Sequence, residues 1–483
     1  MAYALDYDKS IDIITTLVKA GSNVNERIKN GITPIMIAGV SCKDPEIINF
    51  LVKSGADINA TDEDGKSALM WAAEKTEYPQ NILALLKNGA DPTIKLHMYL
   101  KTALDYAEQN VKIKETEVYN ILQSISSLDK FNNLYQKGSI DECKKILGFA
   151  RVFINAEDEN NQTPLMNLIL AGNRNEVVKL LIDGGADVNY RAKNGITPLM
   201  LAAETDNLEL IKLLIKSGAK IDARDKDGYT PFLYAAKSNK NPEIINFFLA
   251  SGSSVNTKDT NGETPLMIAA KYNLNPDIIT ALIKAGSQVN VTTNAGWTPL
   301  IYAAAYNPNP EILTALINQN ANIQAKTTAK IHLDLRDDRF NTNGFTALMF
   351  AALYNEKPEK IEILLKNGVN FIKDKTGKKI EITVRDTGLT ALMLAASFNS
   401  NQPIIISLIN NGANVNALDR DGTSVLENAA LHTTNPEIIL ILLKSGANPK
   451  IKDKDGKTAL DYAKENSSLK DTDAFWKLND VSY

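Results

Sequence analysis

A unit of 33 to 34 residues recurs along this 483-residue chain, and the period constrains the fold more than any other feature. Each copy opens on a Thr or Ser that precedes a short apolar run. Such a period indicates that one small unit of secondary structure is stacked many times, with apolar faces buried between adjacent copies. The openings are Thr33, Ser67, Thr102, Thr163, Thr197, Thr230, Thr264, Thr298, Thr346, Thr390, Ser424 and Thr458.

The copy at residues 195–226 shows what one unit contains. Thr197 is a good N-cap, and Pro198 stands at the first helical position, where its missing N–H is not needed. A second helix is predicted over Leu208–Ser217, because apolar residues recur there at helical spacing. Gly218 ends that helix, since glycine readily adopts the left-handed conformation. The unit is therefore helix, turn, helix and loop.

The repeated motifs include TPLMLAA at 197–203, TPLMIAA at 264–270, GGADVN at 184–189 and NGANVN at 411–416. These motifs resemble those of the ankyrin-repeat family. The resemblance covers nearly the whole chain, and it implies an all-α solenoid of helix-turn-helix repeats with β-hairpin fingers between them. Where the family usually has His after T-P-L, this chain has Met, which should add apolar packing and leave the fold intact.

The period is interrupted once between two groups of repeats. Thr102 and Thr163 lie 61 residues apart, which is short of two full periods. Residues 102–107 match the last copy at 458–463, so we interpret the first of these as an end repeat. A degenerate copy follows, with helices predicted near Asp129–Gln136 and Ile140–Leu147. The sequence thus predicts an N-terminal array over residues 1–126 and a C-terminal array over residues 127–483.

Two insertions lengthen the C-terminal array. About 14 and 10 residues are added to the period after Thr298 and Thr346, and they predict extended fingers near 326–341 and 372–386. Both inserted segments alternate apolar and polar residues, which predicts strands that could pair edge to edge. Harmless loop growth is an equally good explanation. The strand patterns contain Ile331, Leu333 and Leu335 in one insertion and Ile380, Ile382 and Val384 in the other, with a turn predicted at 374–377.

Composition narrows the classes of partner. A net charge of −4 and a pI of about 5.7 give no reason to expect nucleic acid or a membrane surface. The first residues lack the basic flank and apolar run of a signal peptide. Two cysteines are too few for a disulfide framework and favour a reducing compartment. We expect a cytoplasmic monomer, and secretion into another cell by a signal-less route is left open.

Neither the histidines nor the loop motifs form a catalytic or metal-binding set. The three histidines lie in different repeats, without the spacing of metal ligands. Residues 65–67 and 456–458 resemble the end of a phosphate-binding loop, but the Gly required five residues earlier is absent. The Asp-rich fingertips lack the terminal Glu of a calcium loop. We therefore expect a protein that is not an enzyme, with no catalytic residues, metal or cofactor. The histidines are His97, His332 and His432.

The resemblance implies a binding surface at two repeated positions. One is the finger residue just before the helix-opening Thr, and the other follows the Ala-Ala pair of the first helix. Aromatic residues at these positions would supply large contact areas at small entropic cost. Regular recurrence at the second position is also what packing between repeats would produce, so we favour Tyr229, Trp297 and Phe345. The candidates are Tyr229, Trp297, Phe345 and Leu389 at the first position, and Tyr272, Tyr306, Tyr354 and Phe398 at the second.

These observations predict a non-enzymatic scaffold or adaptor. It would bind one or more proteins through the concave face of the C-terminal array, as the resemblance implies. The alternative is an effector or inhibitor that occludes a partner enzyme through the extended fingers.

Overall fold

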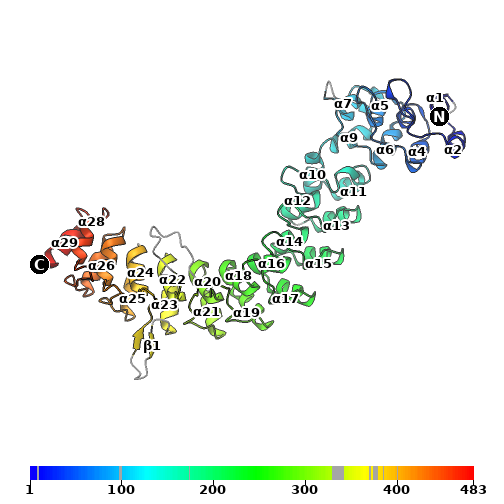
Figure 1. The fold of residues 1–483 in the computed structure, drawn as a ribbon. Helices are drawn as coiled ribbons and strands as arrows, with labels where there is room; N and C mark the ends of the chain where they lie inside the picture. The colour runs from blue at the N-terminus through cyan, green and yellow to red at the C-terminus, as the bar shows by residue number, and fades with distance from the viewer. Residues whose placement is uncertain are drawn as a thin grey trace. The chain divides into compact units, whose positions relative to one another are not determined.

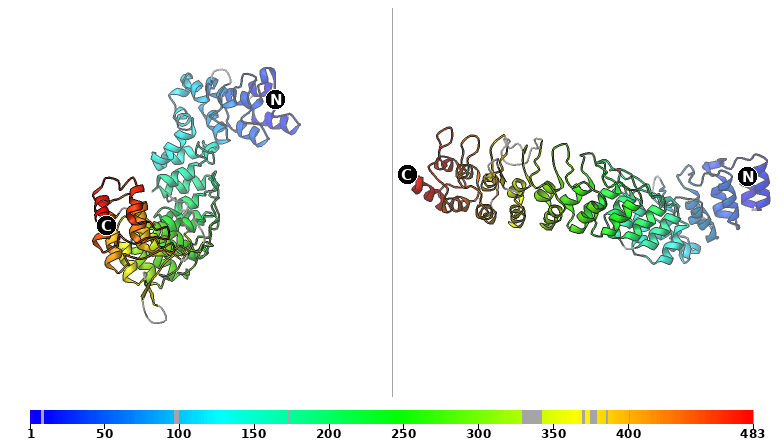
Figure 2. Two further views of the ribbon diagram at one scale, coloured as in Figure 1. Left: turned by 60° about the vertical axis from the view of Figure 1, so that its left-hand side comes forward. Right: turned by 90° about the horizontal axis from the view of Figure 1, so that it is seen from below.

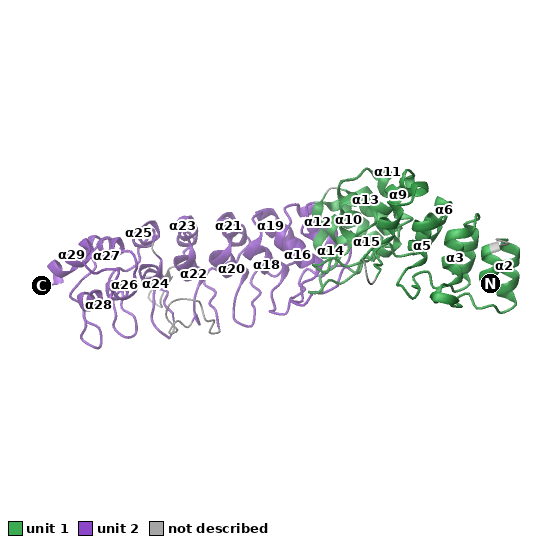
Figure 3. Ribbon diagram, turned by 90° about the horizontal axis from the view of Figure 1, so that it is seen from above, with its two compact units in different colours: residues 1–202, 207–220 green, residues 203–206, 221–483 purple. Residues whose placement is uncertain are grey.

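The computed structural model describes the whole chain except residues 8–9, 97–99, 173, 329–341, 369–370, 374–378, 385, 400 and 483. In the described part, helices dominate and a single two-stranded ladder is present, which confirms the predicted all-α repeat solenoid. The chain divides into two compact units (Figure 3). The first comprises Met1–Ala202 and Asn207–Lys220, and the second comprises Ala203–Asp206 and Ile221–Tyr483. The predicted division after residue 126 falls inside the first unit and stays a prediction.

The first unit contains the predicted helix pairs. The degenerate copy forms α10 (Leu128–Lys137) and α11 (Ile140–Leu147), as its residue pattern indicates. The copy at 195–226 forms α14 (Pro198–Ala203) and α15 (Leu208–Lys216), within one residue of the predicted end of the second helix. The remaining helices are α1 (Ala2–Tyr7), α2 (Ile11–Lys19), η1 (Lys29–Gly31), α3 (Pro34–Ser41), α4 (Glu46–Lys53), α5 (Ala68–Lys75), α6 (Pro79–Lys87), α7 (Ala103–Ala107), α8 (Val111–Lys114), α9 (Glu117–Ser124), η2 (Arg151–Phe153), α12 (Pro164–Ala171) and α13 (Asn175–Asp183).

In the second unit the first helix of each repeat lies in one layer and the second helix in another (Figures 1 and 2). Loops between repeats project beyond the layer of first helices (Figure 3). The first helices are α16 (Pro231–Ser238), α18 (Pro265–Tyr272), α20 (Pro299–Tyr306), α22 (Ala347–Tyr354), α24 (Ala391–Phe398), α26 (Val425–His432) and α28 (Ala459–Glu465). The second helices are α17 (Pro242–Ala250), α19 (Pro276–Lys284), α21 (Glu311–Asn318), α23 (Glu359–Lys366), α25 (Gln402–Asn410), α27 (Glu437–Lys444) and α29 (Asp473–Ser482).

Helix starts follow from the residues that open each copy. The Thr264 side chain accepts a hydrogen bond from the Met267 N–H, with Pro265 at the first helical position. The second helix of the same repeat begins with Asn275, whose side chain accepts from the Asp277 N–H. These caps satisfy backbone donors that a helix cannot satisfy internally. Met267 itself is fully buried, so the Met that replaces the family's usual His packs in the core, as expected.

A ladder of buried asparagines joins successive first helices. Asn273 donates through Nδ2 to the carbonyls of Ala236 (3.0 Å) and Asn239 (2.8 Å) in the preceding repeat. Asn307 repeats the arrangement, with bonds of 3.0 Å to Ala270 and 2.7 Å to Asn273. Carbonyls at a helix C-terminus lack intrahelical partners, and the neighbouring repeat supplies the donors here. We call this set of contacts the asparagine ladder.

The ladder is interrupted between α20 and α22. Asn355 reaches Ala304 O at 3.3 Å, and its second bond, 2.8 Å, goes to Ala351 O in its own helix. Among the described residues, no donor reaches Asn307 O across this junction. The regular pattern resumes at Asn399, which donates to Ala352 O and Asn355 O at 2.9 Å. The interruption coincides with the repeat that carries the first insertion.

Several fingers are closed by a few hydrogen bonds within a tight turn, and not by paired strands. Asp225 N donates to Tyr229 O at 3.1 Å, for example, which closes the turn. Adjacent fingers touch, since Thr260 N donates to Asp227 O at 3.0 Å. Gly228 (φ +79°) permits this approach, because a Cβ there would lie 2.9 Å from Thr260 N. Isolated bridges occur at Thr61–Ser67 and Leu418–Ser424.

The second insertion forms an antiparallel ladder between β1 (Phe371–Lys373) and β2 (Lys379–Glu381). Figure 1 places β1 beyond α23 and α25, on the side of the second helices. Of the predicted strand residues, Ile380 lies in β2, whereas Ile382 and Val384 follow it as buried side chains. The predicted turn at 374–377 lies outside the described residues. So do Ile331, Leu333 and Leu335 of the first insertion, and the pairing between the two fingers stays a prediction.

Replacing a ladder asparagine should destabilise the second unit. Asn307→Ala leaves two buried carbonyls without donors, and we expect a loss of about 2 to 4 kcal/mol in the free energy of unfolding. Urea denaturation, monitored by circular dichroism, measures this loss in the free energy of unfolding. Asn355→Ala is the matched control, because Asn355 makes only one long cross-repeat bond. The free energy of unfolding should fall less than half as much in this variant as in Asn307→Ala. Equal losses for both variants would contradict a stabilising role for the ladder.

Candidate functional site

The finger residues that we favoured as partner contacts are mostly buried. Trp297 is 3% exposed and Phe345 is fully buried, so the expectation that they lie on an open surface is wrong. The Trp297 ring packs 4.9 Å from Tyr302 and 4.6 Å from Phe350, between centroids. Phe345 packs 5.5 Å from Phe350. The fingers turn these side chains onto the first helices, where burying aromatic area stabilises the fold.

The remaining finger candidates are also partly or wholly covered. Leu389 is buried, and its carbonyl accepts a hydrogen bond from Val384 N at 2.9 Å. Tyr229 is half-buried, with its ring edge against Tyr234 at 5.5 Å. Burial raises the pKa of Tyr229 above its ordinary value, and nearby carboxylates add to the shift. A partner could reach only part of Tyr229 and little of Leu389.

Exposed aromatic surface lies instead at the second predicted position. Tyr272, Tyr306 and Tyr354 are 43%, 46% and 38% exposed, and they end α18, α20 and α22. Tyr306 and Tyr354 stack with ring centroids 6.2 Å apart. Tyr306 and Tyr354 therefore pack on each other, and all three side chains remain partly exposed to solvent. We call these three residues the tyrosine strip. Phe398, at the next equivalent position, is half-buried against His432 at 5.2 Å.

A network of charged side chains contacts two residues of the tyrosine strip, Tyr272 and Tyr306. Lys271 Nζ lies 3.3 Å from Glu263 Oε1, and it also lies 5.0 Å and 5.6 Å from the ring centroids of Tyr272 and Tyr306. Burial lowers the pKa of Lys271, but the Tyr272 hydroxyl and the Glu263 carboxylate outweigh this, and the net shift is upward. Tyr302 OH donates to Glu263 Oε1 at 2.5 Å. A charged lysine among ring faces gains cation–π attraction, so the network holds the strip in place.

A cavity of about 520 Å³ opens where the asparagine ladder is interrupted, and Tyr306 and Tyr354 are among its lining residues. Lys360, also in the lining, is only 6% exposed, and its Nζ donates to Ala303 O and Ala304 O at 3.2 Å each. Ile312 occupies the matching position of the preceding repeat and is fully buried. Burial lowers the pKa of Lys360 to about 8. Comparing repeats position by position could have identified this lysine from the sequence.

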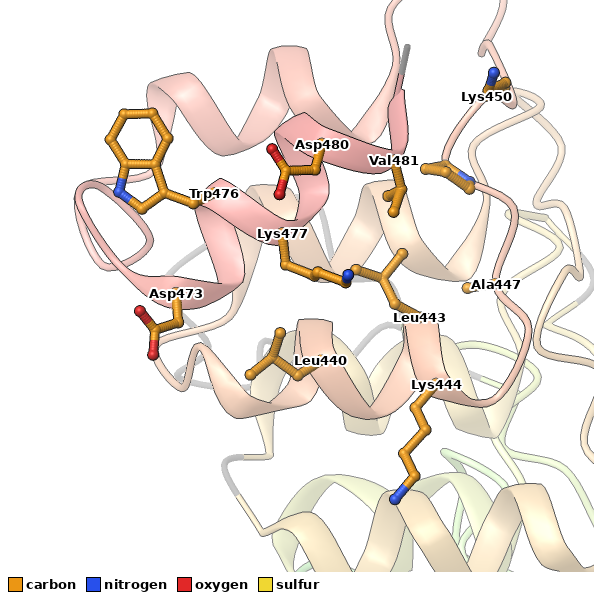
Figure 4. A pocket seen from close by; sticks show the side chains of 11 residues that line it. Leu440, Leu443, Lys444, Ala447, Lys450, Asp473, Trp476, Lys477, Asp480 and Val481 are labelled. Carbon is orange, nitrogen blue, oxygen red and sulfur yellow. The ribbon is translucent and has the colours of Figure 1, made fainter.

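Further cavities of larger or similar size lie elsewhere in the described residues, among them two with the following linings. One of about 780 Å³ lies between α27 and α29, with the half-exposed Trp476 at its edge (Figure 4). Its lining mixes Asp473 and Asp480 with lysines, and Leu440 and Leu443 face it from α27. The other, about 440 Å³, lies in the first unit beside α3 and α5. Neither contains a predicted site residue.

The described residues hold no cluster of three or more His, Cys, Asp or Glu side chains that could bind a metal. Cys42 and Cys143 are buried and are not joined in a disulfide. His432 packs against Phe398 with tilted rings, whereas His97 and His332 lie outside the described residues. In the same part of the chain, no helix is long and apolar enough to cross a bilayer.

Removing the buried charge of Lys360 should stabilise the fold. Because the pKa is lower in the folded state (about 8) than its ordinary value of 10.5, the unfolded chain binds the proton more tightly. Stability therefore rises as the pH increases from about 8 to 10.5, and the full penalty applies below pH 8. We expect Lys360→Met to raise the free energy of unfolding by about 1 to 3 kcal/mol at pH 7 and to remove this pH dependence. Urea titrations at pH 7 and pH 10 test this, and a less stable variant would contradict it.

Comparison with known families agrees with the helix pairs described above. A model of three consecutive ankyrin repeats matches residues 1–95, 134–225, 232–327, 328–419, 348–453 and 392–474. No curated protein matches the chain. Ankyrin repeats are in general modules of protein–protein interaction. The matched segments span most of the sequence, and the chain belongs to the ankyrin-repeat family.

Proposed function

We propose that this protein is a non-enzymatic scaffold or adaptor that binds a protein partner through the tyrosine strip. The observation that carries the proposal is the regular exposure of Tyr272, Tyr306 and Tyr354 on three successive first helices. Tyrosine is enriched at binding hot spots because it buries a large area with few rotatable bonds and keeps a polar tip. This set replaces Trp297 and Phe345 as the direct contacts, since a partner cannot reach buried rings without unfolding a repeat.

The rigidity of the surface supports the same proposal. Tyr306 and Tyr354 stack on each other, and Lys271 holds Tyr272 and Tyr306 from below. Side chains that are already ordered lose little entropy when a partner binds. Lys237, 5.8 Å from the Tyr272 ring centroid, adds charge at one end of the strip. Affinity would come from the aromatic rings and selectivity from the surrounding charged side chains. Cys42 and Cys143 form no disulfide with each other, which fits a protein that works in the cytoplasm.

Affinity capture with strip variants tests the proposal. We expect the triple variant Tyr272→Ser, Tyr306→Ser and Tyr354→Ser to retain at least tenfold less of any partner that the intact chain captures, because hot-spot area is lost. Trp476→Ser is the control, since Trp476 is an exposed aromatic residue distant from the strip in sequence. Circular dichroism verifies that each variant is folded. Undiminished capture by the folded triple variant would exclude the strip as the binding surface.

Deleting the insertions tests the alternative, an effector or inhibitor that acts through extended fingers. Residues 329–341 and 372–380 are each replaced by Gly-Gly in the otherwise intact chain. We expect capture to be retained, because β1 lies on the side of the second helices and the strip lies on first helices. Loss of the partner with the strip intact would favour the finger mechanism.

A further inference from the structure

Lys360 is a buried cation for which the described residues provide no opposite charge. An ammonium group has three N–H donors, and only two find acceptors here, the carbonyls of Ala303 and Ala304. Buried charges are normally paired, because an unpaired charge loses its hydration without compensation. No carboxylate of the described residues lies within ion-pair distance of Nζ. The unused donor and the uncompensated charge are what an anionic ligand would satisfy.

The cavity beside Lys360 has room for such a ligand. It measures about 520 Å³, and its lining includes Tyr306 and Tyr354 of the tyrosine strip. The other charged groups in the lining are Glu356, Lys357 and Glu359, which are all exposed, so water screens their effect on a ligand. Burial raises the pKa of Tyr354 to about 12 and also raises that of Tyr306, so both rings stay neutral where Lys360 titrates.

We propose that this cavity is a carboxylate subsite, in which an aspartate or glutamate side chain of the partner enters beside Tyr306 and Tyr354 and accepts a hydrogen bond from Lys360. The assignment rests on the proposed function, because the same two tyrosines belong to the strip and line the cavity. That continuity favours an acidic side chain of a bound protein over a free small acid. An ion pair of this kind compensates the buried charge, which the free protein leaves without a partner.

Binding of a carboxylate should be linked to protonation of Lys360. The ammonium form pairs with the anion, so ligand binding raises the pKa of Lys360 above its value of about 8 in the free protein. Affinity must then fall as the pH rises from 7 to 9.5, where the free protein has lost this proton. The two tyrosines of the lining do not reproduce this window, because burial raises the pKa of Tyr354 to about 12 and raises that of Tyr306 as well.

Benzoate is a suitable probe, and benzamide is its neutral counterpart of nearly the same shape. Saturation-transfer NMR titrations of the full chain at constant ionic strength compare the two at pH 7 and pH 9.5. We expect benzoate to bind at least fivefold more tightly at pH 7 than at pH 9.5, and benzamide to show no such change. Lys360→Met should abolish the preference for benzoate, and it should fold because a buried Ile occupies this position in the preceding repeat. Equal benzoate binding by wild type and Lys360→Met, or equal binding of benzoate and benzamide, would overturn the subsite.

A peptide pair identifies the source of the carboxylate. Acetyl-Tyr-Glu-Tyr-amide should bind more tightly than acetyl-Tyr-Gln-Tyr-amide, and Lys360→Met should remove the difference. If benzoate binds but the two peptides do not differ, the partner side chain is excluded and the subsite takes a free small acid. Partner capture by the strip variants and the benzoate titration are independent measurements. Failure of the proposed function can therefore be distinguished from failure of the subsite.

Discussion

The second unit depends on the hydrogen bonds that one repeat donates to the helix ends of the one before it. Asn273 and Asn307 each occupy the position directly after a tyrosine of the strip, Tyr272 and Tyr306. The amide that joins two repeats therefore also fixes where the adjacent ring emerges. Tyr306 thus precedes a bonded asparagine, and it stacks on Tyr354 across the junction where the ladder is interrupted. A structural constraint and a candidate binding surface thus arise from neighbouring residues.

The same logic explains why the cavity lies where it does. At the junction of α20 and α22 the asparagine ladder loses its usual bond to Asn307 O, and the amine of Lys360 covers the helix end instead. The long, flexible side chain of Lys360 fills the space at this helix end less completely than the pair of side chains found in the preceding repeat. There the space is filled by Ile312 and by the amide of a ladder asparagine. The cavity and the uncompensated charge are two results of one local change. Ionisable groups with perturbed pKa values are concentrated at functional sites, which agrees with a ligand at this cavity.

Sequence reasoning predicted the repeat and its helices because short-range chemistry determines them. Thr-Pro and Asn-Pro-Glu openings set the helix starts locally, and α15 begins at Leu208 as its cap indicates. The direction of a side chain on a finger is different, since it depends on which helix the finger folds against. Trp297 packs against Phe350 of α22, across an insertion whose path the sequence does not specify, and Phe345 packs against the same ring. Lys360 was overlooked because a lysine in an amphipathic helix is ordinarily solvated, and only its position in the repeat identifies it as buried.

The bonds between neighbouring fingers have a consequence for how the loops respond to force and thermal motion. Thr260 N is bonded to Asp227 O, and Arg420 N to Thr387 O, so a loop is tied to the one beside it at its tip. Where two neighbouring fingers are bonded in this way, displacing one of them must stretch or break its bond to the other. Long connections usually move independently, whereas two bonded fingers must move together or separate. A partner that presses on one of these fingers therefore meets the resistance of both.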